Sequence, residues 1–406
     1  MSTEKTPLEK QVSPLVQKFI LGAVIAVILL IVVLRLIPVD DKGGYVEIKS
    51  KPKAKKEFTI TGIEAAQKTS TFLKNLETQS QAFEIKTCNA EGKCAFEGKQ
   101  TAPSYAWKIL AYSALLNLSK EASYLSKISS IYDEMYKISD GTDLSWSAAQ
   151  IFFAFKTTGE IAYTDRIYEA VRGFREVVES NFDPKKHAQE SMLLAVGARQ
   201  MALVYGMLGD KKIVEFLRNK RSISYKADLF EKDRTAFKEA GKKLLDLAIQ
   251  SDSAHGNIVP GISEFREDGC WIALAKLEFA RSAEEPKYYE ELQELFKKLD
   301  FSERNYKQLL FSSASQVHPC IEVLLDLSEK NQDFKADAQA LMEHFVLAVW
   351  DTPIHKICDG DFGYLASYRS HGSECANNIK ANTDAAYAIY LLSRFNEQQL
   401  KVAVHE

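Results

Sequence analysis

The chain has 406 residues, and 52 lysine and arginine residues against 55 acidic residues give it a formal net charge of −3. Hydrophobic residues make up 46% and charged residues 26% of the chain, which excludes a disordered or a collagen-like protein. The near-neutral charge argues against a nucleic-acid partner, because no excess of positive charge is present to neutralise phosphates. With 10 prolines and 19 glycines, turn-forming residues are few for an all-β fold.

The N-terminal region contains one long apolar segment. After a short polar head at 1–18, residues 19–37 read FILGAVIAVILLIVVLRLI and carry only one charge, Arg35. A helix of that length spans a hydrocarbon core of about 30 Å. The segment is too long for a cleavable signal peptide, and the RLIPVDD at its end offers no small-residue cleavage site. The sequence therefore predicts a single transmembrane helix that acts as a signal anchor.

The orientation of this anchor is indicated by two opposing features. A lysine-rich juxtamembrane linker follows at 38–60, and by the positive-inside rule it would place the C-terminal domain inside. The six cysteines favour the outside, because Cys88 and Cys94 form one local pair and Cys358 and Cys375 another, as is typical of loop disulfides in an oxidising compartment. Since long domains can translocate despite flanking charge, we expect an extracytoplasmic C-terminal domain at the cell membrane.

From about residue 61 onward, apolar residues recur at helical spacing. Twelve long helices are predicted at 62–80, 103–118, 121–138, 144–158, 161–180, 186–208, 226–250, 268–282, 286–299, 308–329, 332–350 and 382–395, with a short extra helix near 211–222. One small β-hairpin is predicted over 81–100, where apolar and polar residues alternate on either side of NAEGK. The helices pair at a repeat of about 42 residues. The second helix of each pair is apolar or small nearly all round and is expected to be buried, whereas the first is amphipathic.

This pattern of helices resembles the (α/α)6 toroid, the six-hairpin fold. The resemblance covers about 61–396, leaving a tail at 397–406, and includes the closing pattern DGDFGYLASY…NTDAAYAIYLLSRF. It implies an all-α ring of inner and outer helices, an architecture found in glycoside hydrolases, polysaccharide lyases, sugar epimerases, terpene cyclases and lanthionine cyclases. The fold alone does not choose among them. The loops that enter the inner helices would share one face of the ring, and their length predicts a binding site there.

Carboxylates and flat aromatic residues gather near this predicted face. Sugar rings pack on aromatic planes while acids bind their hydroxyls, so these residue types suit a carbohydrate site. The candidate catalytic acids are Glu190, Asp268, Asp359 and Asp361, and the candidate substrate-binding residues are Trp107, Trp146, Trp271, Tyr364, Tyr368 and Tyr387. A glycosidase would need two such acids facing one bond. The alternative is structural: Asp268 caps its helix and the tryptophans belong to the core.

Two further cysteines are predicted to lie close together. In EDGCWIAL, an N-cap at Asp268 puts Cys270 at the second helical position. In QVHPCIEVLL, Pro319 at the first helical position would put Cys320 at the second. At one level of neighbouring inner helices, the cysteines could form a disulfide. The resemblance to lanthionine cyclases implies a second possibility, a zinc site with His318, although that family has Cys and His adjacent.

Three functions remain open at this point. The first is a single-pass, membrane-anchored extracytoplasmic domain that binds or processes surface carbohydrate in the toroid mouth, as a glycoside hydrolase or lyase would, without metal or other cofactor. The second is a non-catalytic helical-repeat scaffold that binds an envelope protein. The third is a zinc-dependent enzyme that uses Cys270, His318 and Cys320. No Walker, GxGxxG, HExxH or GxSxG pattern selects one of them.

Overall fold

In a computed structural model, the chain divides into two units, Met1–Glu57 and Phe58–Glu406. The structure describes residues 86–88, 94–96, 102–138, 146–180, 190–220, 227–253, 268–299, 314–342 and 386–396. The predicted head, transmembrane helix, linker, first helix and tail lie outside the described residues. Within the described ranges, no single helix is long and apolar enough to cross a bilayer. One pair, α8 (Ser191–Met207) with α9 (Lys211–Lys220), meets those criteria only jointly and is bent by 91°.

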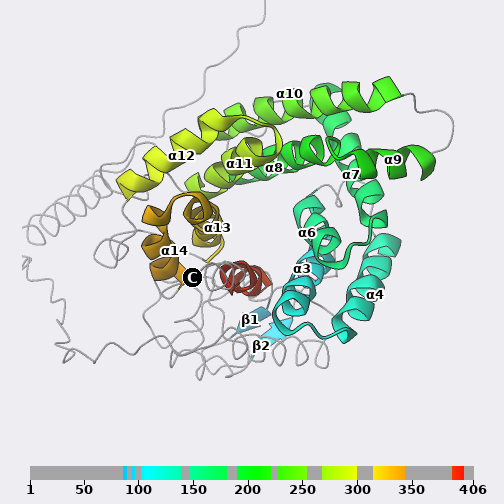
Figure 1. Cartoon of the computed structure of the whole chain (residues 1–406), viewed down its shortest axis with the longest axis horizontal. Coiled ribbons are helices and arrows are strands. Elements are labelled where there is room, and N and C mark those ends of the chain that lie inside the picture. The colour runs from blue at the N-terminus through cyan, green and yellow to red at the C-terminus, as the bar shows by residue number, and fades with distance from the viewer. Residues whose placement is uncertain are drawn as a thin grey trace, which may run out of the picture. The chain divides into compact units, whose positions relative to one another are not determined.

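Helices make up nearly all regular structure in the described part of the chain (Figure 1). Two three-residue strands, β1 (Lys86–Cys88) and β2 (Cys94–Phe96), pair antiparallel with Cys88 opposite Cys94, at the position of the predicted hairpin. The helices before α8 are α3 (Ala102–Ser119), α4 (Ser123–Ile138), α6 (Ala148–Thr158) and α7 (Ala162–Ser180). Those after α9 are α10 (Ala227–Asp252), α11 (Gly269–Ser282), α12 (Pro286–Leu299), α13 (Ala314–Lys330), the 3-10 turn η2 (Gln332–Phe334) and α14 (Lys335–Leu341). A last helix, red in Figure 1, covers 386–396.

The buried helices of this domain contact one another in chain order. Contacts run from α3 to α6, from α6 to α8, from α8 to α11 and from α11 to α13. On α8, Ala195, Ala198 and Met201 are wholly buried, whereas α7 and α12 each bury only one face. The predicted alternation of buried and amphipathic helices is therefore confirmed in the described residues, and so is the all-α class. Closure into an (α/α)6 toroid stays a prediction.

Short turns connect each of three buried helices to the amphipathic helix that follows. Lys120 after α3, Gly159 after α6 and Glu284 after α11 all have positive φ angles, of 59°, 76° and 53°. A left-handed residue at this place ends a helix and reverses the chain within a few residues. The backbone N–H of Gly159 donates to the carbonyl of Phe155, which closes the last turn of α6.

The start of α13 corrects one sequence-based prediction. Pro319 was expected at the first helical position, but it lies inside α13, which begins at Ala314. A proline there removes one backbone N–H from the helix, which normally destabilises it. The loss falls in the early turns of α13, and the residues that follow, including Ile321 and Leu324, are fully buried. Burial of this apolar face outweighs the missing hydrogen bond.

Candidate functional site

Three of the predicted sugar-binding aromatics meet near the N-terminal ends of the buried helices. The ring of Tyr387, on the last helix, lies 5.4 Å from that of Trp107 on α3 and 6.2 Å from that of Trp271 on α11. The His318 ring lies 5.4 Å from the same tyrosine. Tyr387 is buried, and the two tryptophans are partly buried against the core. The structure therefore brings these residues together as a packed aromatic cluster rather than as an open platform.

The other described candidates lie apart from this aromatic cluster. Trp146 packs on Phe174 with ring centroids 5.0 Å apart. Glu190 is exposed at the residue before α8. Asp268 occupies the N-cap position of α11, but its side chain makes no capping hydrogen bond and instead accepts one from Ser191. The remaining candidates lie outside the described residues: Asp359, Asp361, Tyr364 and Tyr368.

A disulfide joins Cys270 on α11 to Cys320 on α13, with their Cα atoms 4.8 Å apart. This confirms the predicted pairing of two neighbouring buried helices. Both cysteines are buried, and neither sulfur is left as the thiolate that zinc coordination requires. The described residues also contain no group of three or more histidine, cysteine, aspartate or glutamate side chains able to hold a metal. His318 beside the disulfide is fully buried, and burial lowers its pKa to about 3, so its ring is neutral.

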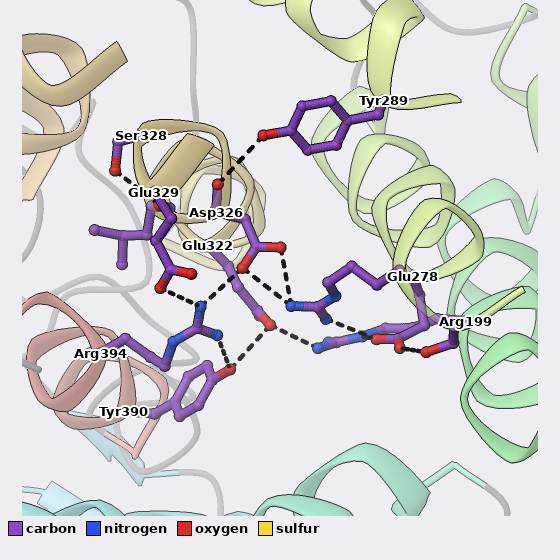
Figure 2. Close-up of polar contacts among 12 residues, drawn as sticks. Arg199, Glu278, Tyr289, Glu322, Asp326, Ser328, Glu329, Tyr390 and Arg394 are labelled. Atoms are coloured by element: carbon purple, nitrogen blue, oxygen red, sulfur yellow. Dashed lines mark hydrogen bonds and ion pairs between the residues drawn. The ribbon is translucent and has the colours of Figure 1, made fainter. Parts of the chain in front are cut away.

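One turn along α13 from His318, Glu322 is the centre of a buried polar network (Figure 2). Arg199 of α8 donates from Nη2 to Glu322 Oε1 over 2.7 Å. The hydroxyl of Tyr390 donates to the same oxygen at 3.0 Å, and the hydroxyl of Tyr387 donates to Oε2 at 2.6 Å. A carboxylate with no exposed surface thus has partners on α8 and on the last helix. Such a group is costly to bury unless it is paired in this way.

A second carboxylate of α13, Asp326, lies one turn further along the helix and extends the network. Arg281 of α11 donates from Nη1 to both of its oxygens at 3.1 Å, and Arg394 of the last helix donates to Oδ1 at 2.8 Å. Arg281 also donates from Nη2 to Glu278 at 2.8 Å, where Ser282 donates to the other carboxylate oxygen.

We call Arg199, Glu278, Arg281, Glu322, Asp326 and Arg394 the arginine–carboxylate cluster. It joins four helices with three positive and three negative groups (Figure 2).

The charges of the cluster are fixed by its own members. Burial alone would raise the pKa of Glu278 and of Asp326, but the guanidinium groups around them outweigh burial and hold both values below the ordinary range. Burial, followed by the charge of Glu322, raises the pKa of Tyr390 to about 12, so that its hydroxyl stays protonated as a donor. A general acid needs a raised pKa near working pH, and neither Glu278 nor Asp326 has one.

A cavity of about 580 Å³ lies against this cluster, along α6 and toward the C-terminal ends of α8, α11 and the last helix. One face of each helix forms its wall, at spacings of three and four residues. These wall residues are Ala149, Phe152, Phe153 and Lys156 of α6, Arg199, Leu203, Gly206 and Met207 of α8, Glu278, Arg281 and Ser282 of α11, and Tyr390 and Arg394 of the last helix. Gly209, Asp210, Ile213, Arg234 and Glu284 complete the wall.

This cavity lies at the opposite ends of the buried helices from the face predicted by the long loops. The sequence analysis missed it because the connections near it are short, and short loops gave no reason to expect a site. A signal was nevertheless present, since Arg199 and Glu322 are charged residues flanked by apolar residues along their helices. A buried charge in an apolar helix needs a partner, and that requirement pointed to a polar interior.

The chain matches no family model, and no curated protein or solved structure is significantly similar to it. The described side chains are therefore the basis on which function can be argued.

Proposed function

We propose that the protein is a membrane-anchored, extracytoplasmic domain that binds surface carbohydrate in the cavity at the C-terminal ends of its buried helices. The observation that carries this proposal is the composition of the cavity wall. Phe152, Phe153 and Tyr390 offer apolar ring surface next to fixed arginine and carboxylate groups. Sugars bind through this combination, because their C–H faces pack on rings while their hydroxyls take directed hydrogen bonds. The volume of about 580 Å³ is in the usual range of small-molecule sites.

The cavity supports binding better than cleavage. Hydrolysis of a glycosidic bond normally uses one protonated and one ionised carboxyl group. Glu278 lines the cavity, but its pKa lies below the ordinary range, and arginines from two helices engage it. A carboxylate held in this state is a poor proton donor at neutral pH.

Two further features support the rest of the proposal. The buried disulfide of Cys270 and Cys320 is what an oxidising, extracytoplasmic compartment allows. The last helix contacts α3 through Trp107 and α13 through Glu322, which are the contacts that a closed ring of hairpins would need. The proposal of a membrane anchor is supported by the length and composition of the apolar run at 19–37.

The test is ligand binding by the full chain in detergent micelles, measured by ligand-observed NMR against a panel of mono- and oligosaccharides. Filling the cavity through Ala149→Phe should abolish binding, because the new ring occupies the wall of α6 without removing a charge. Ala122→Phe places the same ring at an exposed site away from the cavity and should bind normally. The NMR spectra of the oligosaccharides should show no cleavage after incubation with the protein. Absence of binding across the panel, or binding that Ala149→Phe leaves intact, would contradict the proposal and favour a protein-binding scaffold.

A further inference from the structure

The cavity wall carries more positive than negative side chains. Lys156, Arg199, Arg234, Arg281 and Arg394 line it, against Asp210, Glu278 and Glu284, so the wall has a formal charge of 5 − 3 = +2. The two carboxylates that balance this excess, Glu322 and Asp326, belong to α13 and are not among the wall residues. A ligand in the cavity therefore meets more cationic than anionic side chains.

Two of the three acids of the wall, Glu278 and Asp210, already accept hydrogen bonds from the protein. Glu278 accepts hydrogen bonds from Arg281 and from Ser282. Asp210 accepts at Oδ1 from the backbone N–H groups of Lys212 and Ile213, at the start of α9. These contacts occupy carboxylate oxygens that would otherwise accept hydrogen bonds from sugar hydroxyls.

Two of the cationic residues, Lys156 and Arg234, in contrast have hydrogen-bond donors to spare. Among the described residues, Lys156 has no carboxylate within ion-pair distance, and its ammonium group lies over the rings of Phe152 and Phe155, 5.2 and 5.6 Å from their centroids. Arg234 donates from Nε to the carbonyl of Tyr205, and its ion pair with the exposed Glu231 is long, at 3.9 Å. A guanidinium group has five N–H donors, so most of those on Arg234 remain available. A wall with surplus donors favours a ligand rich in acceptors.

We propose that the cavity selects acidic sugars, whose carboxylate or phosphate group is bound by the cationic side chains of its wall. This inference rests on the proposed carbohydrate function and specifies its substrate class. Lys156 and Arg234 supply charge and donors to the anionic group, and the rings of Phe152 and Phe153 pack on the sugar. Carboxylates and phosphates match arginine geometry equally well, so both are named.

The experiment measures Kd for four probes on the full chain in detergent micelles: glucose, glucuronate, glucose 6-phosphate and inorganic phosphate. Glucuronate differs from glucose by one carboxylate, which makes the pair a direct measure of the anionic contribution. We expect at least one of the two acidic sugars to bind about tenfold more tightly than glucose, with an affinity that falls as salt rises. Inorganic phosphate should bind more weakly than glucose 6-phosphate, because it lacks the ring.

Two variants assign this preference to the wall. Lys156→Gln, at an exposed side chain, should reduce the preference about threefold without affecting folding, and adding Arg234→Gln should remove it. Lys287→Gln is the matched control, because Lys287 is also an exposed lysine over an aromatic ring but lies outside the cavity wall. A melting curve for each variant excludes loss of the fold.

The outcomes separate the two proposals. Affinities for glucuronate and for glucose 6-phosphate that both equal the affinity for glucose, or a preference that survives in the double variant, would overturn acidic selectivity while carbohydrate binding stands. Inorganic phosphate binding as tightly as glucose 6-phosphate, with no binding of glucose or glucuronate, would show an anion site and refute both proposals. No binding of any probe would also refute both. A preference for an acidic sugar that the double variant loses and the Lys287→Gln control retains would support both.

Discussion

The disulfide between Cys270 and Cys320 should contribute a large part of the stability of the helical domain. We consider the double variant Cys270→Ala with Cys320→Ala, which removes the cross-link without placing polar groups in a buried site. A cross-link limits the conformations of the unfolded chain, and its effect grows with the length of the loop that it closes.

The magnitude follows from a sequence separation of 50 residues. For a loop of this length the chain-entropy treatment gives about 14 cal/mol/K, which corresponds to about 4 kcal/mol of unfolding free energy at 25 °C. The lost sulfur contacts in the core add to this value. With a urea m-value of about 2–3 kcal/mol/M, the midpoint of unfolding should fall by about 1.5–2 M.

The assay is urea unfolding of the full chain, followed by far-UV circular dichroism, for the wild type and the double variant. The folded wild type should resist mild reductant, because Cys270 and Cys320 are 1% and 0% exposed. The same reductant in urea should reproduce the midpoint of the variant. A loss of less than about 1 kcal/mol would refute the reasoning, because the unfolded chain would then gain no freedom when the link is removed.

Three more predictions concern the interior of the domain. Burial lowers the folded-state pKa of His318 to about 3, below its ordinary value of about 6.5. The free energy of unfolding should therefore fall as pH drops from 6.5 toward 3. In His318→Gln the urea midpoint should depend less steeply on pH in this window. Glu322→Leu should destabilise the domain by about 3–5 kcal/mol, because it leaves Arg199 without its closest carboxylate. Adding Arg199→Leu should recover part of this loss, which a double-mutant cycle measured by thermal unfolding would show. Gly241→Ala should cost about 1–3 kcal/mol in the same assay, because a Cβ there would lie 2.8 Å from that of Met201 on α8.

The proposed function connects the arginine–carboxylate cluster to the cavity. A buried cluster with balanced charges is compatible with a purely structural role, since replacing such groups with apolar residues is often neutral or stabilising. The guanidinium groups of Arg199, Arg281 and Arg394 also form part of a cavity wall, which gives them access to a ligand. Binding measurements on the wall variants therefore address function, while the Glu322 cycle addresses stability, and the two roles can be separated.

The sequence by itself determined the helices, their pairing and which member of each pair is buried. These properties are local, because apolar residues at helical spacing show which face of a helix will leave water. The same reasoning anticipated the link between Cys270 and Cys320, since each cysteine was expected at the same level of neighbouring buried helices. It misjudged Pro319, because the preference of proline for the first helical position was weighed without the burial energy of α13.

Only the tertiary structure decided which polar side chains meet in the interior. Arg199 and Glu322 are 123 residues apart in the chain, and no local pattern indicates that α8 and α13 place them within 2.7 Å. The location of the cavity depends in the same way on the packing of helices that range from α6 to the last helix of the described residues. Side-chain spacing along one helix gives the direction of a group but not its partner, because the partner is set by how the helices are arranged around the core.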